Sequence, residues 1–135
     1  IDINDYLAAM DRQHADGLIM TMEADDPKWS FVGLDRHNLV TRVVEKEVIS
    51  NEATVGIYNF RRGAAFVAAA DRMIAKNLRV NNEFYVAPVY NEMIEDGARI
   101  AIYNVGREGA GMYGLGIPTD LDLFLANPVS LKAVA

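Results

Sequence analysis

The chain contains no cysteine and no long hydrophobic run. The lack of cysteine excludes disulfide bonds, thiolate nucleophiles and thiolate zinc sites, although it is compatible with any cellular compartment. The apolar runs are far too short to cross a bilayer, and the residues after Ile1 form neither a basic leader region nor a cleavable apolar segment. We therefore expect a cytoplasmic protein without a membrane partner.

Positive charge is scarce as well. The sequence has 13 Lys and Arg residues against 19 Asp and Glu residues, which gives a net charge of −6. A negative net charge repels the phosphodiester backbone, so binding to nucleic acid would require a local basic patch. The adjacent arginines Arg61 and Arg62 are too few to form one. We expect no nucleic-acid partner.

What is present is enough apolar material for a core, because 51% of the 135 residues are hydrophobic. We read residues 1–135 as a single domain or a fragment of one. The chain starts at Ile1, without methionine and in what resembles the middle of an α/β unit. We therefore expect an N-terminal part to be missing.

Helical and strand-like patterns alternate along the chain, which is typical of an α/β fold. The run Leu18 to Met22 is uniformly apolar, as in strands covered on both faces by helices. We predict a mixed sheet with flanking helices. The expected strands cover residues 18–22, 29–34, 39–44, 53–60 and 98–105, and the expected helices cover 5–14, 63–76, 89–96 and a final segment that starts at Pro118.

Two opposite charges, Glu45 and Lys46, stand at the end of a predicted strand. Adjacent strand residues point to opposite faces, so both charges can face one surface only if the chain has already bent. A carboxylate accepts hydrogen bonds from hydroxyl groups and an ammonium neutralises a phosphate, so the pair suits a sugar phosphate. Taken alone, however, two charges at a strand end are typical of a solvated surface.

Four segments around and after this pair form an ordered set of motifs. They are Val44-Glu45-Lys46, Val55-Gly56-Ile57-Tyr58, Asn82-Glu83-Phe84-Tyr85-Val86-Ala87-Pro88, and Met112 to Leu121. In this order they resemble the C-terminal half of the sugar-1-phosphate nucleotidyltransferases, particularly those of bacterial surface and capsular polysaccharide gene clusters. The resemblance covers most of the chain and implies the C-terminal part of a Rossmann-like (GT-A type) nucleotidyltransferase domain.

The resemblance implies the sugar-phosphate-binding half of an enzyme that forms an NDP-sugar and pyrophosphate from an NTP and a sugar 1-phosphate. In this reading Glu45 accepts a hydrogen bond from a sugar hydroxyl and Lys46 binds the phosphate. Thr54, Val55 and Glu83 line the same pocket. We also expect a homo-oligomer.

Other family features are absent. The nucleotide-binding loop and the central metal-binding aspartate belong to the N-terminal half, so an NTP would bind through that half. Mg²⁺ is expected from the family, yet Gly114 stands where the family has a metal-binding aspartate, and this chain shows no evident ligands. Its glycine-rich stretch, residues 106–116, does not fit the spacing of a phosphate-binding loop. The catalytic residues stay unknown.

Two alternatives remain open. The chain can be a non-catalytic sugar-binding or regulatory homologue, or an α/β domain in which Glu45 and Lys46 serve only solubility. We also expect the strand at Leu18 to Met22 to have an open edge without the N-terminal half, because that half would supply its neighbours. Such an edge would favour self-association.

Overall fold

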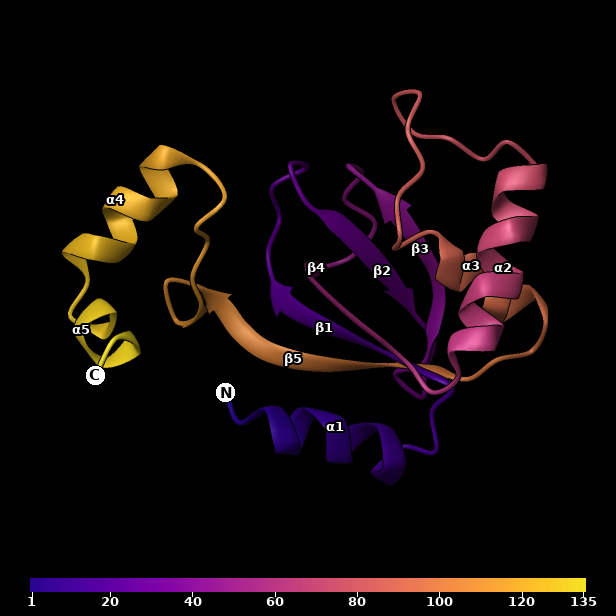
Figure 1. Cartoon of the computed structure of the whole chain (residues 1–135), viewed down its shortest axis with the longest axis horizontal. Coiled ribbons are helices and arrows are strands. Elements are labelled where there is room, and N and C mark those ends of the chain that lie inside the picture. Colours follow the sequence, from indigo (N-terminus) through magenta and orange to yellow (C-terminus); the bar gives the residue numbers. More distant parts are fainter.

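A six-stranded mixed sheet forms the centre of the computed structural model, which describes all residues from Ile1 to Ala135 (Figure 1). The strand order is β3-β2-β4-β1-β5-β6, with β1 antiparallel to β4 and parallel to β5. The predicted α/β fold with a mixed sheet is confirmed. The strands are β1 (Gly17–Glu23), β2 (Ser30–Leu34), β3 (Val40–Glu45), β4 (Glu52–Phe60), β5 (Ile100–Glu108) and the short β6 (Gly111–Met112), which the sequence did not predict.

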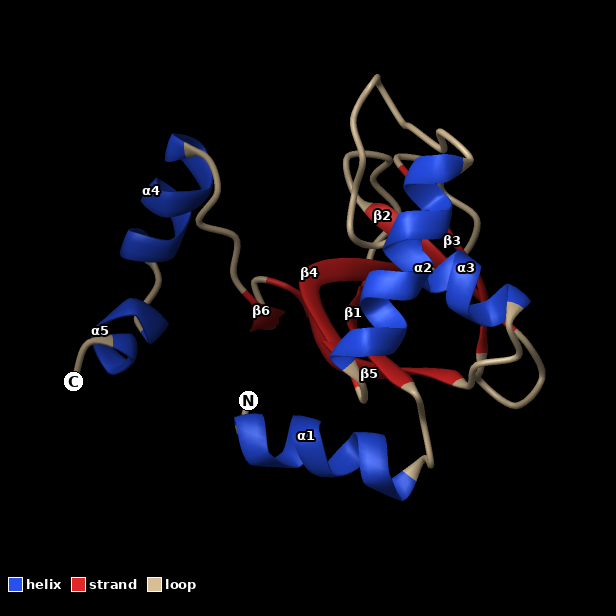
Figure 2. Cartoon of the chain, turned by 45° about the vertical axis from the view of Figure 1, so that its right-hand side comes forward, coloured by secondary structure: helices blue, strands red, loops and turns tan.

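Three helices pack on the sheet and two lie apart from it. In Figures 1 and 2, α1 lies on one side of the sheet and α2 and α3 on the other, while α4 and α5 lie beyond the end of β5. No helix combines the length and hydrophobicity needed to span a bilayer. The helices are α1 (Ile3–Arg12), α2 (Gly63–Ala75), α3 (Val89–Glu95), α4 (Pro118–Ala126) and α5 (Val129–Ala133), the last of which was not predicted.

Strand β1 is buried on both faces, as its apolar run predicted. Leu18 and Met20 belong to the cluster that α1 covers, whereas Ile19 belongs to the cluster under α2 and α3. This split follows from the alternation of side chains along a strand. The sheet therefore has a hydrophobic core on each side.

The open edge expected at β1 is wrong. β4 and β5 flank β1 on its two sides, because β4 returns antiparallel to it within this same chain. The side of β4 that faces away from β1 is the less protected one, since β2 pairs with it only between Phe31 and Ala53.

The predicted apolar stripes of α1 and α2 are each partly wrong. Leu7, expected on the buried face of α1, is 48% exposed, and the helix ends at Arg12 rather than His14. In α2, Ile74 is 51% exposed, while Ala69 and Met73 are buried. Phe66, Ala70 and Met73 pack on the core as predicted. The packed face of α2 is therefore shifted toward Ala69 and away from Ile74.

Candidate functional site

A pocket of about 430 Å³ lies where the ends of β2 and β3 meet β4 and the segment before α3. Four of the five residues that the sequence proposed for the site line it together, namely Glu45, Lys46, Thr54 and Val55. Residues far apart in the sequence complete the walls. They are Lys28, Trp29, Ser30, Gly56, Tyr58, Tyr85, Val86 and Ala87.

Glu45, the last residue of β3, is half-buried in this pocket. Its Oε2 accepts a hydrogen bond from the hydroxyl of Ser30, its cross-strand partner. No other hydrogen bond and no ion pair within the chain uses the carboxylate. Oε1 therefore has no partner within the chain, although a half-buried charge normally has one, and it is available to a ligand.

Lys46 follows at a bend of the backbone. Its φ of 57° lies in the left-handed region, which costs a residue with a side chain about 1 to 2 kcal/mol. This bend lets Glu45 and Lys46, although adjacent in sequence, line the same pocket. We expected the two charges to face one surface only if the chain had bent at this point. Lys46 is exposed and forms no ion pair or hydrogen bond within the chain; its Nζ lies 6.0 Å from the centre of the Tyr85 ring.

Thr54 and Tyr58 supply hydroxyl groups to the pocket. Thr54 Oγ1 and the Tyr58 hydroxyl lie 3.0 Å apart, which is possible because the β1–β4 register shifts between them and Gly56 adopts a φ of 84°. Burial raises the pKa of Tyr58; the Thr54 hydrogen bond opposes this shift, and the charge of Glu45 adds to it. The phenol therefore stays protonated at neutral pH and can donate a hydrogen bond.

Glu83, the fifth proposed residue, does not line the pocket. It is exposed, and its Oε2 accepts a hydrogen bond of 2.7 Å from the hydroxyl of Tyr85, which does line it. That bond is the main reason why the pKa of Tyr85 is raised. Glu83 thus contacts a residue of the pocket, Tyr85, but is not itself part of the pocket wall.

Sequence reasoning missed the aromatic side chains of the pocket, Trp29, Tyr58 and Tyr85. Tyr58 and Tyr85 belong to the quoted motif segments, so a signal was present. Aromatic rings beside a few polar groups are typical of small-molecule sites. Trp29 carried no such signal, because only the fold brings this residue, which directly precedes β2, to the same pocket as β4.

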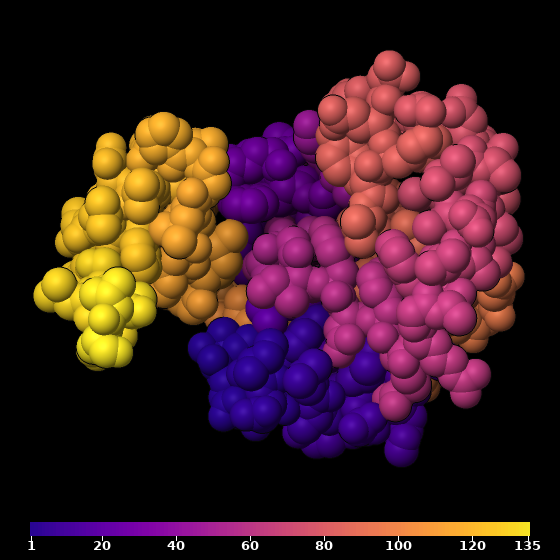
Figure 3. Space-filling model, in the orientation of Figure 1, coloured from indigo at the N-terminus to yellow at the C-terminus, as the bar shows by residue number.

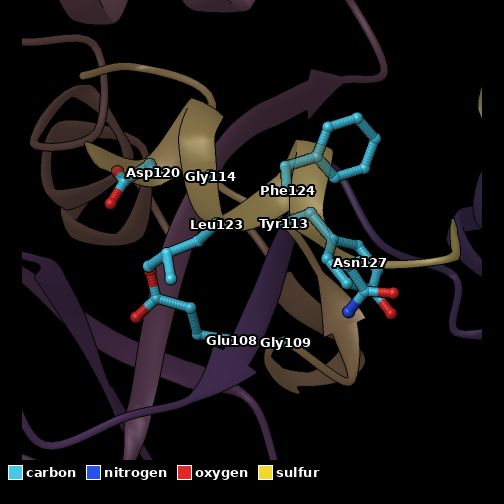
Figure 4. A pocket seen from close by; sticks show the side chains of 8 residues that line it. All are labelled: Glu108, Gly109, Tyr113, Gly114, Asp120, Leu123, Phe124 and Asn127. Atoms are coloured by element: carbon cyan, nitrogen blue, oxygen red, sulfur yellow. The ribbon is translucent and has the colours of Figure 1, made fainter. Parts of the chain in front are cut away.

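A second cavity, of about 340 Å³, lies between the β5–β6 turn and α4. Figure 4 shows the carboxylates of Glu108 and Asp120 on one side of it and the rings of Tyr113 and Phe124 on the other. Gly114 lies in its wall, where an added Cβ would be 3.1 Å from Asp120 Oδ2.

The side chains of this chain alone do not make a magnesium site. Only Glu108 and Asp120 bring carboxylates to the second cavity. No group of three or more His, Cys, Asp or Glu side chains in the structure could hold a metal ion. Mg²⁺ in proteins is usually held by one or two carboxylates together with substrate phosphates and water, so the two carboxylates of this cavity would need phosphates to complete a site.

No family model matches the chain, and neither does any curated protein. Solved structures do match. A nucleoside-diphosphate-sugar pyrophosphorylase from Vibrio cholerae RC9 is 28% identical over 85% of this chain and 48% of its own, with a TM-score of 0.78. A Bacillus anthracis protein described as a glucose-1-phosphate thymidylyltransferase is 19% identical over 93% of this chain and 48% of its own, with a TM-score of 0.67.

A third match, a CMP:2-keto-3-deoxy-manno-octonic acid synthetase, is 14% identical over 98% of this chain and 56% of its own, with a TM-score of 0.57. The α/β fold therefore corresponds to part of a nucleotidyltransferase domain. More particularly, the chain is related in structure to the sugar nucleotidyltransferases. It spans about half the length of the structures that it matches.

Proposed function

We propose that this chain is the sugar-phosphate-binding half of a nucleotidyltransferase that forms an NDP-sugar and pyrophosphate from an NTP and a sugar 1-phosphate. One observation carries the proposal. Glu45 and Lys46 share a pocket, yet neither forms an ion pair within the chain. Opposite charges that line one pocket without internal ion-pair partners suit a ligand with hydroxyl groups at one end and a phosphate at the other.

The pocket has the chemistry for such a ligand. The free oxygen of Glu45 accepts a hydrogen bond from a sugar hydroxyl, and Lys46 neutralises the phosphate. The Tyr58 hydroxyl donates to a sugar oxygen, and the ring of Trp29 offers an apolar surface to the C–H face of the sugar. A volume of about 430 Å³ is within the usual range for small-molecule sites.

The NTP would bind through the other half of the fold, because the chain covers about half of the nucleotidyltransferases that it matches. Nucleotidyl transfer depends mostly on positioning and on neutralisation of phosphate charge. This chain contributes to both at the sugar phosphate. The motif segments favour a role in surface or capsular polysaccharide synthesis. We further propose that the protein is cytoplasmic and a homo-oligomer.

Replacement of Lys46 tests the proposal. Lys46→Ala should weaken binding of glucose 1-phosphate, measured by calorimetry, by roughly tenfold to a hundredfold, the range for loss of one charge-assisted hydrogen bond. Lys132→Ala is the matched control, since Lys132 is exposed on α5 outside the pocket. If Lys46→Ala bound glucose 1-phosphate within about twofold of the wild-type affinity, Lys46 would not be a phosphate-binding residue.

Gly114 favours a second candidate, a non-catalytic sugar-binding or regulatory protein. It brings no carboxylate to the second cavity, where the resemblance to the family leads us to expect a metal-binding aspartate. In that case the protein would bind glucose 1-phosphate but release no pyrophosphate from any NTP supplied with Mg²⁺. Pyrophosphate release that depends on the sugar phosphate would exclude this candidate.

A further inference from the structure

Ser30 lies directly across the β2–β3 ladder from Glu45. The two residues are Cα partners at the end of that ladder, so their side chains stand on the same face of the sheet. Both are half-buried and both line the pocket. We propose that Ser30 is a positioning residue that fixes the carboxylate of Glu45 for one arrangement of sugar hydroxyls. The inference rests on the proposed function of this pocket.

The hydrogen bond from Ser30 is the only anchor of the Glu45 carboxylate. Oε2 accepts it, and no other hydrogen bond or ion pair in the chain holds either oxygen. A glutamate side chain has several rotatable bonds and loses much conformational freedom when it is fixed. Without Ser30, a ligand would have to order the carboxylate itself, whereas with Ser30 one oxygen is fixed and Oε1 stays open.

The position of the Ser30 hydroxyl is well defined. Ser30 has a single side-chain torsion, and it is the first residue of β2, next to Phe31, which is fully buried at 0% exposure. Groups placed on strands hold their geometry better than groups on loops. The hydroxyl of Ser30 therefore presents a fixed donor to Glu45.

A fixed acceptor should discriminate between sugars that differ only in the orientation of one hydroxyl. Epimers place that hydroxyl in different directions, and a site built to accept one leaves a buried polar group unpaired with the other. A mobile carboxylate could follow either epimer. Loss of the Ser30 hydroxyl should therefore reduce discrimination as well as affinity for the preferred sugar.

Two substitutions of nearly equal shape isolate the hydroxyl. Ser30→Thr keeps it and Ser30→Val replaces it with a methyl group, and both residues favour strands. The affinities for α-glucose 1-phosphate, α-galactose 1-phosphate and α-mannose 1-phosphate are measured by calorimetry, and the fold is checked by near-UV dichroism. Ser30→Thr should keep the wild-type ratio of affinities, and Ser30→Val should reduce that ratio roughly threefold to tenfold. In a Glu45→Ala background, which leaves no acceptor for the hydroxyl at this position, the Thr and Val variants should no longer differ.

The outcomes separate this inference from the proposed function. If the wild type binds one epimer best and Ser30→Val keeps the same ratio, Ser30 has no positioning role while the sugar-phosphate site stands. Equal wild-type affinities for all three sugars would also overturn the inference. If the wild type binds none of them, the proposed function itself fails. If Ser30→Val does not fold, Ser30→Ala is compared with Ser30→Thr by the same ratio.

Discussion

The hydroxyl of Tyr6 donates a hydrogen bond of 2.9 Å to the carbonyl oxygen of Leu18 and so ties α1 to the start of β1. Tyr90 reaches the same oxygen at 3.4 Å. Tyr6 belongs to the cluster on one face of the sheet and Tyr90 to the cluster on the other. The central strand is therefore fixed from both sides by phenols that must stay protonated.

This arrangement predicts a loss of stability in alkali. Burial raises the pKa of Tyr6 from 10.0 to about 12. A group whose pKa is higher in the folded state contributes stability below its unfolded pKa and loses it as the pH rises through the folded value. The free energy of unfolding should fall between pH 10 and pH 12. Tyr6→Phe should flatten that fall and cost about 1 kcal/mol at neutral pH. An unchanged slope in chemical denaturation of Tyr6→Phe would contradict this.

Gly17 starts β1 at a point where no side chain fits. A Cβ there would lie 2.6 Å from Tyr90 Cε1 and 2.9 Å from Ile100 Cδ1. Gly17→Ala should therefore lower the free energy of unfolding by roughly 1 to 3 kcal/mol through overpacking. Gly63→Ala is the matched control, because nothing lies within 4 Å of a Cβ at that position. Equal thermal midpoints for the two variants would show that the side chains of Tyr90 and Ile100 move aside at little cost in stability.

Glu92 joins α3 to α2 as a buried acid, with only 1% of its side chain exposed. Its Oε2 lies 2.8 Å from Lys76 Nζ and 3.7 Å from Arg72 Nε, without a well-directed hydrogen bond. Glu92→Gln removes the charge that pairs with Arg72 of α2 and with Lys76, the residue that follows the helix. We expect a loss of roughly 1 to 2 kcal/mol in stability, less than for a fully buried pair because both cations reach water. Glu95→Gln, at an exposed acid that also pairs with Lys76, should change the thermal midpoint far less.

The sequence predicted the main helices and strands because their hydrophobic periods are regular. It predicted most of the packing face of α2, but it missed that Ala69 is buried and that Ile74 is left exposed. It placed the open edge at β1 because the antiparallel return of β4 depends on contacts between segments far apart in the chain. A short loop of turn formers predicts that two neighbouring strands pair, as β2 and β3 do, but the side-chain pattern of a strand does not identify partners that are distant in the chain.

The charged pair of the site could be found from residue chemistry and motif wording, but its surroundings could not. Ser30 lies opposite Glu45 only because the β2–β3 register shifts between Gly33 and Leu34, and counting back from the hairpin loop misses such a shift by one residue. The role given to Glu83 came from its place in a motif. The structure instead places the neighbouring Tyr85 in the pocket.

The left-handed conformation of Lys46 leads to a prediction that separates stability from binding. Lys46→Gly and Lys46→Ala both remove the ammonium, so both should weaken binding of glucose 1-phosphate to the same extent. Glycine adopts a φ of 57° without strain, whereas alanine does not. The glycine variant should thus be about 1 kcal/mol more stable than the alanine variant in thermal unfolding. Equal stabilities would mean that the bend relaxes when the lysine is removed.

The last prediction concerns the arm formed by α4 and α5. Figure 3 shows it standing apart from the body beyond a notch in the surface. No residue of α4 is buried, and Leu123, Leu125 and Leu131 are 68%, 62% and 73% exposed. Large apolar patches seldom stay uncovered on a monomer. We expect the chain to self-associate through this arm, in place of the β1 edge.

Sedimentation velocity at micromolar concentrations measures the effect. The wild type should sediment as a concentration-dependent oligomer, and the pair Leu123→Glu and Leu125→Glu should shift it toward the monomer without changing the thermal midpoint, since neither side chain is in the core. Leu7→Glu is the control, because Leu7 is 48% exposed but belongs to α1 and not to the arm. A wild type that stays monomeric at high micromolar concentration, without binding a fluorescent hydrophobic dye, would show that the arm is stable in water as it stands.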